Sequence, residues 1–570
     1  MNLEQASKKI IEEVVRSKIK KREDIEKLKR SIARENHLPR MPTNIELLNF
    51  AERLYSGEEL KRLKRILLTK PSRSLSGVTP VAIMTYPFPC PHGKCAYCPG
   101  GPDSFFGKTP QSYTGKEPAA RRAARANYNP YLQVMNRLEQ YIVLGHEPEK
   151  VELIIMGGTF PSFKKEYQEF FIKKSFQAMN DFSDMFFNNK GFNTKKFQKF
   201  FELPAKFSDE RTKRIQEKLL KIGERTTTLE DEQRRNETSN IRVVAMCIET
   251  RPDYSREAHI NEMLKLGTTR VELGVQSLYD DILKKVKRGH GVKEVVEATQ
   301  LLKDSFLKVG YHMMPGLPGS NEEKDVAMFK KLFEDERFKP DALKIYPLMV
   351  FKGTEIYEWW KRGEFKPLTT KEATEEIIKI KQHIPKYCRI MRVQRDIPTK
   401  FSEAGVDITN LRQHIHEEME RRGLKCNCIR CREPRGRKID FENVRLKRMD
   451  YRASGGYEVF LSYEDEKNDL LLGFIRLRIP NKPFRREISE KTAGIRELHV
   501  YGRALPIGKK LKEGVQHRGF GRKLLEEAER IALEEFDKRE MLIISGIGVR
   551  EYYRKFGYKR KGVYMSKDIE

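Results

Sequence analysis

The sequence predicts an α/β protein with three parts: a helical N-terminal segment, a partial or full barrel of parallel strands, and a separate C-terminal α/β domain. From about residue 78, short apolar runs alternate with helical stretches, which is the pattern of βα units and a parallel sheet. After about residue 441, a hairpin, a strand, a long helix and a further strand indicate a new unit. The 570 residues are also too many for a single hydrophobic core.

The N-terminal segment, residues 1–75, is predicted to be helical and basic. IIEEVVRSKIKKREDIEKLKRSIAR places apolar residues at helical spacing among many Lys and Arg, and KRLKRILLTKPSR continues this pattern up to Pro71. We interpret the segment as a surface that contacts RNA. An ordinary solvated helical cap is the alternative.

The barrel is predicted to span residues 76–384. We expect a helical insertion in the Phe-, Lys- and Asn-rich stretch between Phe160 and Asn240. Residues 385–440 are predicted to form a polar, basic joint, and residues 441–570 the last domain. Chemistry on such barrels is found at the C-terminal ends of the strands. The expected barrel strands are 80–85, 151–158, 242–249, 270–277, 308–316 and 342–350.

The composition predicts a heavily charged, basic surface. Lys and Arg number 112 against 82 Asp and Glu, which gives a net charge of +30. The electrostatic field of a protein with this positive charge attracts polyanions, most often nucleic acid. The alternatives are a proteome rich in lysine or the charge-dense surface of a thermophilic protein, either of which gives the same excess of basic residues. No apolar run approaches the roughly 20 residues of a membrane span, and the N-terminus has no apolar signal core. We therefore expect a cytoplasmic protein without a membrane partner.

The eight cysteines are clustered, which in a cytoplasmic protein favours metal sites over disulfides. Two of them, Cys247 and Cys388, stand alone. The other six form two groups far apart in the sequence, namely Cys90, Cys95 and Cys98, and Cys426, Cys428 and Cys431.

The first group lies in CPHGKCAYC, directly after the first predicted strand. Three thiolates can hold three irons of a 4Fe–4S cube and leave the fourth iron open. The loop closely resembles the cluster loop of radical-SAM enzymes, whose open iron binds S-adenosylmethionine. Tyr97 fits the aromatic residue that is common before the last cysteine in that loop. A zinc site that includes His92 is the alternative.

Other predicted strand ends carry residues suited to hold S-adenosylmethionine. The run Gly157-Gly158-Thr159 ends the second strand, where paired glycines let the backbone approach a ligand. In radical-SAM enzymes this place binds the methionine amino group, although Thr159 stands where an acidic residue is common. Glu249 is expected to bond ribose hydroxyls, and Arg251 to meet the carboxylate. Gln276 follows the next strand. Structural turns are the alternative at each place.

The second cysteine group, in CNCIRC, predicts a structural zinc that pins the joint. Three thiolates need a fourth ligand for tetrahedral zinc. Cys388 is the favoured candidate, with His414 and His416 behind it. Free thiols are the alternative.

In the last domain, QHRGFG (516–521) precedes the helix RKLLEEAERIALEE. A glycine-rich helix start exposes backbone N–H groups to a pyrophosphate, and we expect Gln516, Gly519 and Gly521 there. With ELHV upstream and IISGIG downstream, this order resembles the acetyltransferases that use acetyl-CoA. Tyr552 and Tyr553 are candidates to protonate a departing thiolate. Packing against the sheet is the alternative for both tyrosines.

Both halves together resemble the catalytic subunit of Elongator, the tRNA uridine acetyltransferase, in its archaeal type. The matching stretches include CPGGPDSFFGKTPQSYTGKEP, ETRPDY, GVQS, RVQRDIP, RELHVYG, QHRGFG and YYRKFGY, from about residue 75 to the C-terminus. The chain departs from the family in a longer segment 161–240 and in a CxCxxC more complete than the eukaryotic version. The resemblance implies that the acetyl-CoA contacts are Glu497, Leu498, His499, Val500, Phe520, Gly521, Arg522, Tyr553 and Lys150.

The resemblance implies a tRNA-modifying acyltransferase that uses a 4Fe–4S cluster, S-adenosylmethionine, acetyl-CoA and zinc. In the implied reaction, reductive cleavage of S-adenosylmethionine leads to hydrogen abstraction from the acetyl methyl group. The acetyl carbon then adds to C5 of a flipped-out wobble uridine (U34), and hydrolysis of the thioester leaves 5-carboxymethyluridine. A homodimer or accessory subunits are compatible with the resemblance. The alternatives are a protein-lysine acetyltransferase with a structural cluster and a non-enzymatic tRNA-binding scaffold.

Overall fold

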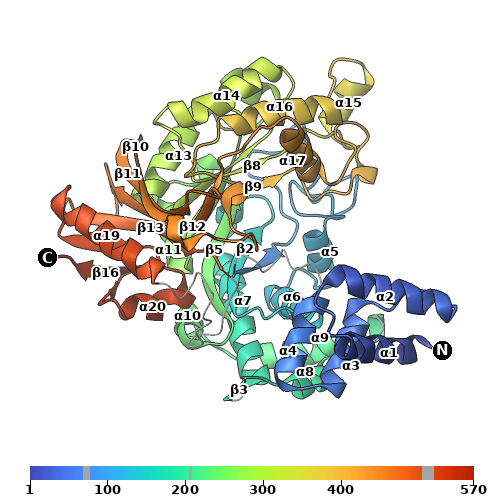
Figure 1. Ribbon diagram of the computed structural model, residues 1–570. Coiled ribbons are helices and arrows are strands. Elements are labelled where there is room, and N and C mark those ends of the chain that lie inside the picture. Colours follow the sequence, from blue (N-terminus) through green and yellow to red (C-terminus); the bar gives the residue numbers. More distant parts are fainter. Residues whose placement is uncertain (69–76, 190, 204–207, 503–518) are drawn as a thin grey trace.

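The computed structural model describes residues 1–68, 77–189, 191–203, 208–502 and 519–570. These residues form a helical N-terminal unit, a central barrel and a C-terminal α/β domain (Figure 1). The predicted fold class is confirmed. Among the described residues, no helix combines the length and apolar character needed to cross a membrane.

The barrel is a seven-stranded parallel sheet whose strands follow one another in chain order, β1-β2-β5-β6-β7-β8-β9. Its first and last strands are not paired with each other, so it is a partial barrel. Outward side chains such as Val81, Ile83 and Leu153 are fully buried under helices, whereas Lys150 and Glu152 line a cavity inside. The strands are β1 (Thr79–Met84), β2 (Lys150–Met156), β5 (Arg242–Thr250), β6 (Arg270–Gln276), β7 (Lys308–Met313), β8 (Ala342–Ile345) and β9 (Arg389–Val393).

The six predicted strands are confirmed, and β9 is an addition that the sequence did not reveal. It pairs in parallel with β8 through Ala342↔Arg389, although these residues were assigned to the joint. The sequence RIMRV hides its apolar alternation because arginines occupy its inward positions. We propose that the barrel ends after β9 and not at residue 384.

Helices cover the outside of the barrel, as the βα alternation predicts. Each lies between two consecutive strands and buries one apolar face. The main covering helices are α6 (Pro130–Val143), α11 (Glu257–Leu266), α13 (Val292–Asp304), α14 (Glu322–Glu334) and α16 (Thr370–Gln382).

The insertion is helical, as predicted, apart from a short hairpin of β3 (Phe187–Asn188) and β4 (Gly191–Phe192). Its phenylalanines pack on one another, for example Phe182 and Phe186 with ring centroids 4.8 Å apart. Glu237 in α10 accepts hydrogen bonds from Arg550 at 2.9 Å and Arg554 at 2.7 Å. The insertion therefore braces the C-terminal domain. Its helices are α7 (Lys165–Phe186), α8 (Thr194–Phe200), α9 (Asp209–Gly223) and α10 (Leu229–Thr238).

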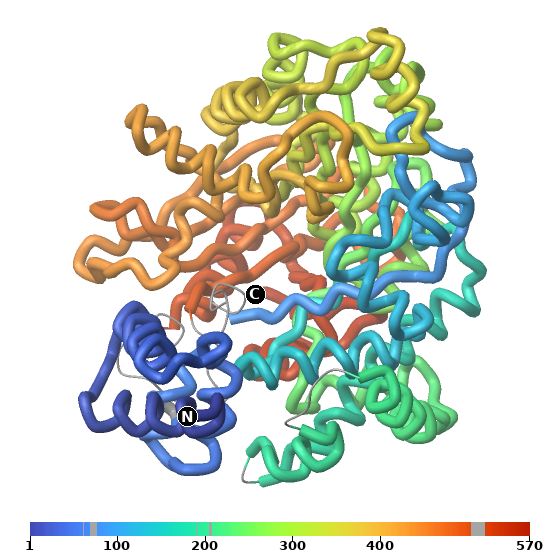
Figure 2. The backbone as a smooth tube through the Cα atoms, turned by 90° about the vertical axis from the view of Figure 1, so that its right-hand side faces the viewer, coloured from blue at the N-terminus to red at the C-terminus, as the bar shows by residue number. Residues whose placement is uncertain are grey.

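The N-terminal helices form a unit with its own apolar core, built from residues such as Ile10, Ile11 and Leu47. Figure 1 places this unit beside the barrel, on the side away from α19 and β16, and Figure 2 shows it at one edge of the molecule. Its outer faces are basic, and the side chains of Arg16 and Lys27 are 79% and 78% exposed. The helices are α1 (Leu3–Arg16), α2 (Arg22–Glu35), α3 (Asn44–Leu54) and α4 (Gly57–Leu67).

The C-terminal domain is a second seven-stranded sheet, in the order β10-β11-β12-β13-β14-β16-β15. Strands β10, β15 and β16 were not predicted. Strands β10 and β15 are rich in exposed charged residues, which hides an apolar pattern. The elements are β10 (Val444–Ala453), β11 (Gly456–Asp465), β12 (Leu470–Ile479), β13 (Thr492–Val500), α19 (Phe520–Glu534), β14 (Glu540–Ile543), α20 (Arg550–Arg554), β15 (Lys559–Lys561) and β16 (Tyr564–Asp568).

This domain packs against the N-terminal ends of the barrel strands. Lys308, the first residue of β7, forms an ion pair with Glu497 in β13. A Cβ atom on Gly546 would lie 2.1 Å from the carbonyl oxygen of Val244, so the two backbones are in direct contact. The C-terminal domain and the cysteine loop after β1 therefore lie at opposite ends of the barrel.

A buried set of ion pairs joins the two domains, and we call it the interface network. Arg496 lies 2.6 Å from Asp341 and 3.0 Å from Glu458, and Arg478 lies 2.5 Å from Asp304. These side chains are at most 1% exposed. The network consists of Lys303, Asp304 and Asp341 from the barrel and Glu458, Arg476, Arg478 and Arg496 from the C-terminal domain.

Candidate functional site

One cavity of about 1860 Å³ runs through the barrel into the C-terminal domain. Its lining includes Cys90 and Cys95 at one end and Leu498 and Gly521 at the other. Pockets for single small ligands usually measure roughly 300–1,000 Å³. The cavity therefore has room for more than one ligand, and it connects the two predicted cofactor sites.

The cysteine loop after β1 presents its thiols around an open space. Cys90 and Cys95 line the cavity, while Cys98 accepts a hydrogen bond from the amide of Ser112 at 3.3 Å. Among the described residues, these three thiols do not form a group with all sulfurs within 4.8 Å of one another. One zinc ion with Zn–S bonds of about 2.3 Å cannot bridge wider separations. The wide separation of the three sulfurs fits a larger group such as a 4Fe–4S cube, and it disfavours the zinc alternative.

The glycine run after β2 lies beside this space. Gly157 and Gly158 have φ values of +119° and +83°, which glycine adopts easily. A Cβ atom on Gly158 would come 3.7 Å from the sulfur of Cys90. Thr159 follows, with its hydroxyl 3.6 Å from the same sulfur. These residues form a backbone cradle where the radical-SAM resemblance requires one.

Gln276 is also strained and faces the same space. Its φ of +71° is unusual for a residue with a side chain, and its buried Oε1 has no hydrogen-bond partner among the described residues. An unpartnered buried amide oxygen is free to accept from a ligand.

Arg251 lines the cavity, and its contact with S-adenosylmethionine stays a prediction. It donates to both carboxylate oxygens of Asp253 at 2.9 Å, and to the carbonyl of Arg288 at 2.8 Å. Arg288, which the sequence did not single out, lies nearer the loop, with Nη1 3.6 Å from the sulfur of Cys95. Arg288 follows a short helix, Asp280–Lys285, and not a strand, so its place in the sequence does not predict a contact with the cysteine loop.

Glu249 belongs to a cluster of charges inside the barrel, which we call the lumen network: Glu249, Glu272, His312 and Lys344. Lys344 lies 2.5 Å from Glu249 and also pairs with Glu272. His312 Nε2 lies 2.9 Å from Glu272 Oε2, and the hydroxyl of Tyr113 donates to Glu249 at 2.9 Å. Glu249 lines the cavity, where it meets Lys344 and Tyr113, and its bond to a ribose stays a prediction. The sequence did carry a signal for this cluster, because each of the apolar strands β6, β7 and β8 contains one of its polar residues, namely Glu272, His312 and Lys344.

The acetyl-CoA end of the cavity is a wedge between β13 and β14. These strands pair in parallel from Thr492↔Glu540 to Ile495↔Ile543. The pairing of β13 with β12 continues to Val500↔Gly473, with a bulge at Arg496. The strands therefore diverge after Ile495, and Glu497, Leu498, His499 and Val500 line the opening together with Lys150. Burial lowers the pKa of Lys150.

The first turn of α19 borders this wedge. Gly519, at its N-cap, has a φ of +76°, and Gly521 and Arg522 line the cavity. Phe520 instead packs on Tyr463, with ring centroids 4.5 Å apart. Gln516 lies outside the described residues.

Both candidate tyrosines line the cavity but differ in burial. Tyr552 is 38% exposed, and its hydroxyl would lie 2.8 Å from a Cβ on Gly521. Tyr553 is 6% exposed and belongs to the core of the domain. Burial raises the pKa of both hydroxyls, so both are protonated and able to donate near pH 7.

The open side of the partial barrel is lined by arginines. Arg122 and Arg137 follow the edge strand β1, and Arg392 and Arg395 lie on and after the edge strand β9. All four line the cavity. This entrance favours an anionic ligand.

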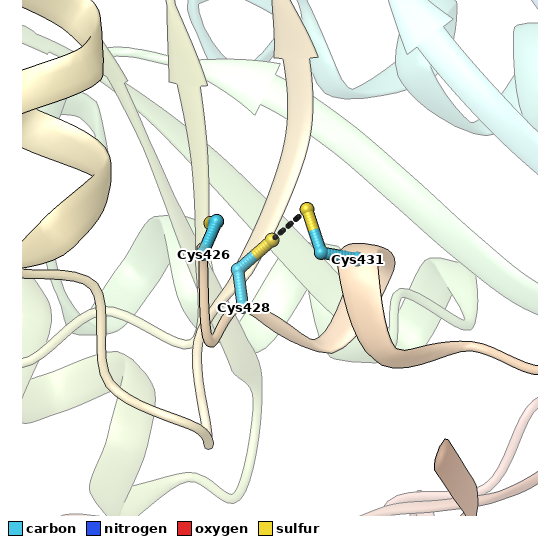
Figure 3. Close-up of side chains that lie close together, drawn as sticks. All are labelled: Cys426, Cys428 and Cys431. Carbon is cyan, nitrogen blue, oxygen red and sulfur yellow. Dashed lines mark hydrogen bonds between the residues drawn. The ribbon is translucent and has the colours of Figure 1, made fainter. Parts of the chain in front are cut away.

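The second cysteine group is tight (Figure 3). The sulfurs of Cys426, Cys428 and Cys431 lie within 4.8 Å of one another, and those of Cys428 and Cys431 are 3.5 Å apart. Sulfurs on a tetrahedral zinc are about 3.8 Å apart, given Zn–S bonds of about 2.3 Å. The three thiols therefore fit a single zinc ion.

The fourth zinc ligand stays a prediction, and two candidates differ in their positions. Cys388 meets this segment through its backbone, because its carbonyl accepts the amide of Ile429 at 3.0 Å. Its thiol is not among the ligand atoms of the described residues that gather within 4.8 Å. His416 Nε2, in contrast, lies 3.8 Å from the sulfur of Cys431. His416 projects from α17 (Leu411–Arg421), and sequence distance gave no means of ranking it above Cys388.

Comparisons with known proteins match the whole arrangement. The chain matches the ELP3 N-terminal domain over residues 3–75, the Radical SAM superfamily over 86–332, the Radical SAM C-terminal domain over 340–421 and the Acetyltransferase (GNAT) family over 428–558.

Relatives of similar length share this organisation. The tRNA uridine(34) acetyltransferase of Methanocaldococcus jannaschii is 49% identical, over 99% of this chain and 97% of the relative. Elongator complex protein 3 of Dictyostelium discoideum is 39% identical, over 96% and 91%. The solved structure of the archaeal Methanocaldococcus infernus Elp3 with an N-terminal deletion covers 87% of this chain and 100% of its own, with a TM-score of 0.71 and 46% identity. The chain belongs to the Elongator complex protein 3 family of tRNA uridine(34) acetyltransferases, which joins a radical-SAM barrel to a GNAT domain.

Proposed function

We propose that this protein converts uridine 34 of tRNA to 5-carboxymethyluridine, with acetyl-CoA as the carbon source. The observation that carries this proposal is the single cavity that links the cysteine loop to the β13–β14 wedge. A simple acetyltransferase needs only the wedge. A shared cavity allows both cofactors and the base to meet.

Different parts of the cavity would hold different cofactors. Cys90, Cys95 and Cys98 would hold a 4Fe–4S cluster, and Gly157–Thr159 with Gln276 would hold S-adenosylmethionine. When bound, these two groups supply one-electron chemistry that can activate a methyl C–H bond. The wedge residues Glu497–Val500 would hold acetyl-CoA, with the pyrophosphate at the start of α19.

Further residues would serve tRNA binding, before the methyl C–H bond is activated, and thioester hydrolysis, after it. Tyr552 and Tyr553 are placed to donate a proton to the thiolate that leaves when the thioester is hydrolysed. The basic outer faces of α1–α4 and the arginines at the open side of the barrel would bind tRNA phosphates. The homodimer or accessory subunits and the cytoplasmic location stay predictions.

The test uses acetyl-CoA deuterated at the methyl group, with cluster-loaded protein, reductant, S-adenosylmethionine and tRNA. We expect deuterium in 5′-deoxyadenosine and a carboxymethyl group on uridine 34. Cys95→Ala should abolish both and leave tRNA binding nearly unchanged, because a thiol is not a phosphate contact. If tRNA is modified while 5′-deoxyadenosine carries no deuterium, the acetyl methyl group is not the site of activation. Transfer of an intact acetyl group to lysine would instead support the acetyltransferase alternative.

We also propose that Cys426, Cys428, Cys431 and His416 bind a structural zinc. Metal analysis of anaerobically purified protein should give about one zinc beside roughly four irons. Cys428→Ser and His416→Ala should lose the zinc and keep the iron, whereas Cys388→Ser should keep both. Loss of zinc from Cys388→Ser with retention in His416→Ala would reverse the assignment of the fourth ligand.

A further inference from the structure

The sulfur of Cys95 has two side-chain nitrogen groups beside it. His92 Nε2 lies 3.2 Å from this sulfur, and Arg288 Nη1 lies 3.6 Å from it. Cys98, in contrast, accepts its hydrogen bond from a backbone amide. A side-chain donor can be removed by substitution while the backbone stays unchanged. Cys95 is therefore the thiol at which the effect of its surroundings can be measured.

The iron-bound form of Cys95 decides which atom donates. A cysteine that ligates iron is a thiolate, so its sulfur can only accept a hydrogen bond. Arg288 has only donors, and His92 must then carry its hydrogen on Nε2. The Nδ1 atom of His92 is buried and has no hydrogen-bond partner among the described residues, so no other contact competes for the tautomer. Both side chains are thus donors to the same sulfur.

The backbone holds the His92 ring in this position. The amide of Gly93 donates to the carbonyl of Cys90 at 3.0 Å, which closes a turn that contains His92. Gly289 packs directly on the ring, because a Cβ atom there would lie 2.8 Å from His92 Cβ and 2.9 Å from His92 Cδ2. Its φ of +75° also favours glycine. A larger residue at position 289 would displace the imidazole from Cys95.

The guanidinium of Arg288 is fixed as well. Its Nε donates to the carbonyl of Gly274 in β6 at 3.1 Å, and the side chain belongs to a residue that is only 7% exposed. Two residues earlier, the carbonyl of Val286 accepts from the amide of Ala96 at 3.0 Å. The segment that carries Arg288 is therefore anchored both to the barrel and to the cysteine loop.

Donors to a cluster sulfur favour the reduced state of the cluster. Reduction adds one negative charge, which is shared with the ligand sulfurs, and an N–H group binds a more negative acceptor more strongly. Hydrogen bonds to the sulfurs are among the factors that set the potential of an iron–sulfur cluster. The positive charge of Arg288 acts in the same direction, since it attracts the added electron.

We propose that His92 and Arg288 are positioning residues that raise the reduction potential of the 4Fe–4S cluster through the sulfur of Cys95. This inference rests on the cluster of the proposed function, but it does not depend on acetyl-CoA or tRNA. One-electron reduction must precede the cleavage of S-adenosylmethionine. The two donors therefore set the fraction of protein that is competent for this cleavage at a given reductant potential.

The experiment is a potentiometric titration of the cluster-loaded protein, followed by electron paramagnetic resonance, without S-adenosylmethionine, acetyl-CoA or tRNA. His92→Leu removes one donor, and we expect the equilibrium constant for one-electron reduction to fall about tenfold, which is a shift of about 59 mV to lower potential. Arg288→Met should lower the potential at least as much, because a positive charge is lost as well. His92→Gln keeps an N–H donor and should restore most of the wild-type potential.

His290→Leu provides the matched control. It also removes a buried imidazole next to the cysteine loop, but His290 Nε2 lies 3.2 Å from the carbonyl of Gly274 and not beside a sulfur. This variant should keep a potential close to that of the wild type. An equal shift in His290→Leu and His92→Leu would show that packing of the segment, and not the contact with Cys95, sets the potential.

A spectroscopic measurement on the wild type makes the test independent of how the variants fold. In protein with isotope-labelled histidine, pulsed electron paramagnetic resonance of the reduced cluster should detect a weak coupling to a histidine nitrogen. This coupling should vanish in His92→Gln. A wild-type cluster without it, or equal potentials in wild type and His92→Leu, would overturn the proposal and leave the proposed function intact. If no 4Fe–4S cluster assembles at Cys90, Cys95 and Cys98, the proposed function fails and this inference fails with it.

Discussion

The lumen network and the interface network are built from the same residue types but face different surroundings. All four residues of the lumen network line the cavity. Of the interface network, Arg496 alone lines the cavity, and Asp341, Arg478 and Arg496 are 0% exposed. Water can solvate an unpaired charge in the first network but not in the second. The difference shows that the surroundings, and not the residue types, decide which of these buried charges a ligand in the cavity could reach.

The largest expected effect follows from breaking the interface network. Asp341→Asn leaves Arg496 and Lys303 without their shared carboxylate, and we expect a loss of about 3–5 kcal/mol in the free energy of unfolding. Glu249→Gln in the lumen network should cost about 1 kcal/mol, because Lys344 keeps Glu272 as its partner. Urea denaturation of the cluster-loaded proteins measures both. Equal losses would contradict the distinction between the two networks.

A second prediction concerns glycines beside each network. Gly546→Ala places a Cβ 2.1 Å from the carbonyl oxygen of Val244, and we expect about 1–3 kcal/mol of destabilisation because backbone must move. Gly274→Ala in the lumen meets only side-chain ends, Arg288 Nη2 at 2.5 Å and Gln276 Nε2 at 3.1 Å, which can turn into the cavity.

For Gly274→Ala we therefore expect a smaller loss of stability but a lower rate of tRNA modification. Thermal unfolding and product formation, measured on the same samples, check both variants. If Gly546→Ala were as stable as the wild type, the backbones at Gly546 and Val244 could move apart at little cost, and the close contact between the two domains would not contribute to stability.

The smallest effect concerns Lys303. The interface network has three carboxylates against four cations, and burial, with nearby Arg496, lowers the pKa of Lys303 to about 8. Between pH 8 and the ordinary lysine pKa of about 10.4, the unfolded chain binds this proton and the folded chain does not. The contribution of Lys303 to the free energy of unfolding therefore increases as the pH rises from 8 to about 10.4. Lys303→Met should remove that rise and cost little at pH 7.

The difference between wild type and Lys303→Met isolates this contribution, because buried tyrosines titrate equally in both proteins. Unfolding midpoints at pH 7, 8, 9 and 10 provide the measurement. A difference between the two proteins that stays constant over this range would show that Lys303 remains charged in the folded state.

Local motifs were predictable because they depend on short spacing. The two cysteine groups, the glycine run after β2 and the glycines at the start of α19 are each contiguous in sequence. The first cysteine group follows β1, the glycine run follows β2, and the last glycines lie at the start of a helix, as predicted. The six strands were also predictable from apolar runs. Strand β9 was not, since its inward arginines mask the alternation.

Pairings over long sequence distances were beyond prediction. His416 and not Cys388 approaches Cys431 because α17 turns that side chain toward the thiols. Arg288 reaches Cys95 across 193 residues, and Arg496 reaches Asp341 across 155. No residue pattern encodes these distances, because they depend on how the strands order in the sheet.

Sequence alone was enough for the fold class, the family resemblance and the two cysteine motifs, because these rest on local spacing and on apolar periodicity. The tertiary structure decided that the residues predicted for the two cofactor sites line one cavity, and that four polar residues from four strands meet inside the barrel. The physical reason is that parallel strands bring residues of equal height together, whatever their separation in the chain. A glutamate, a histidine or a lysine within a strand becomes a site only when neighbouring strands present their partners at the same height.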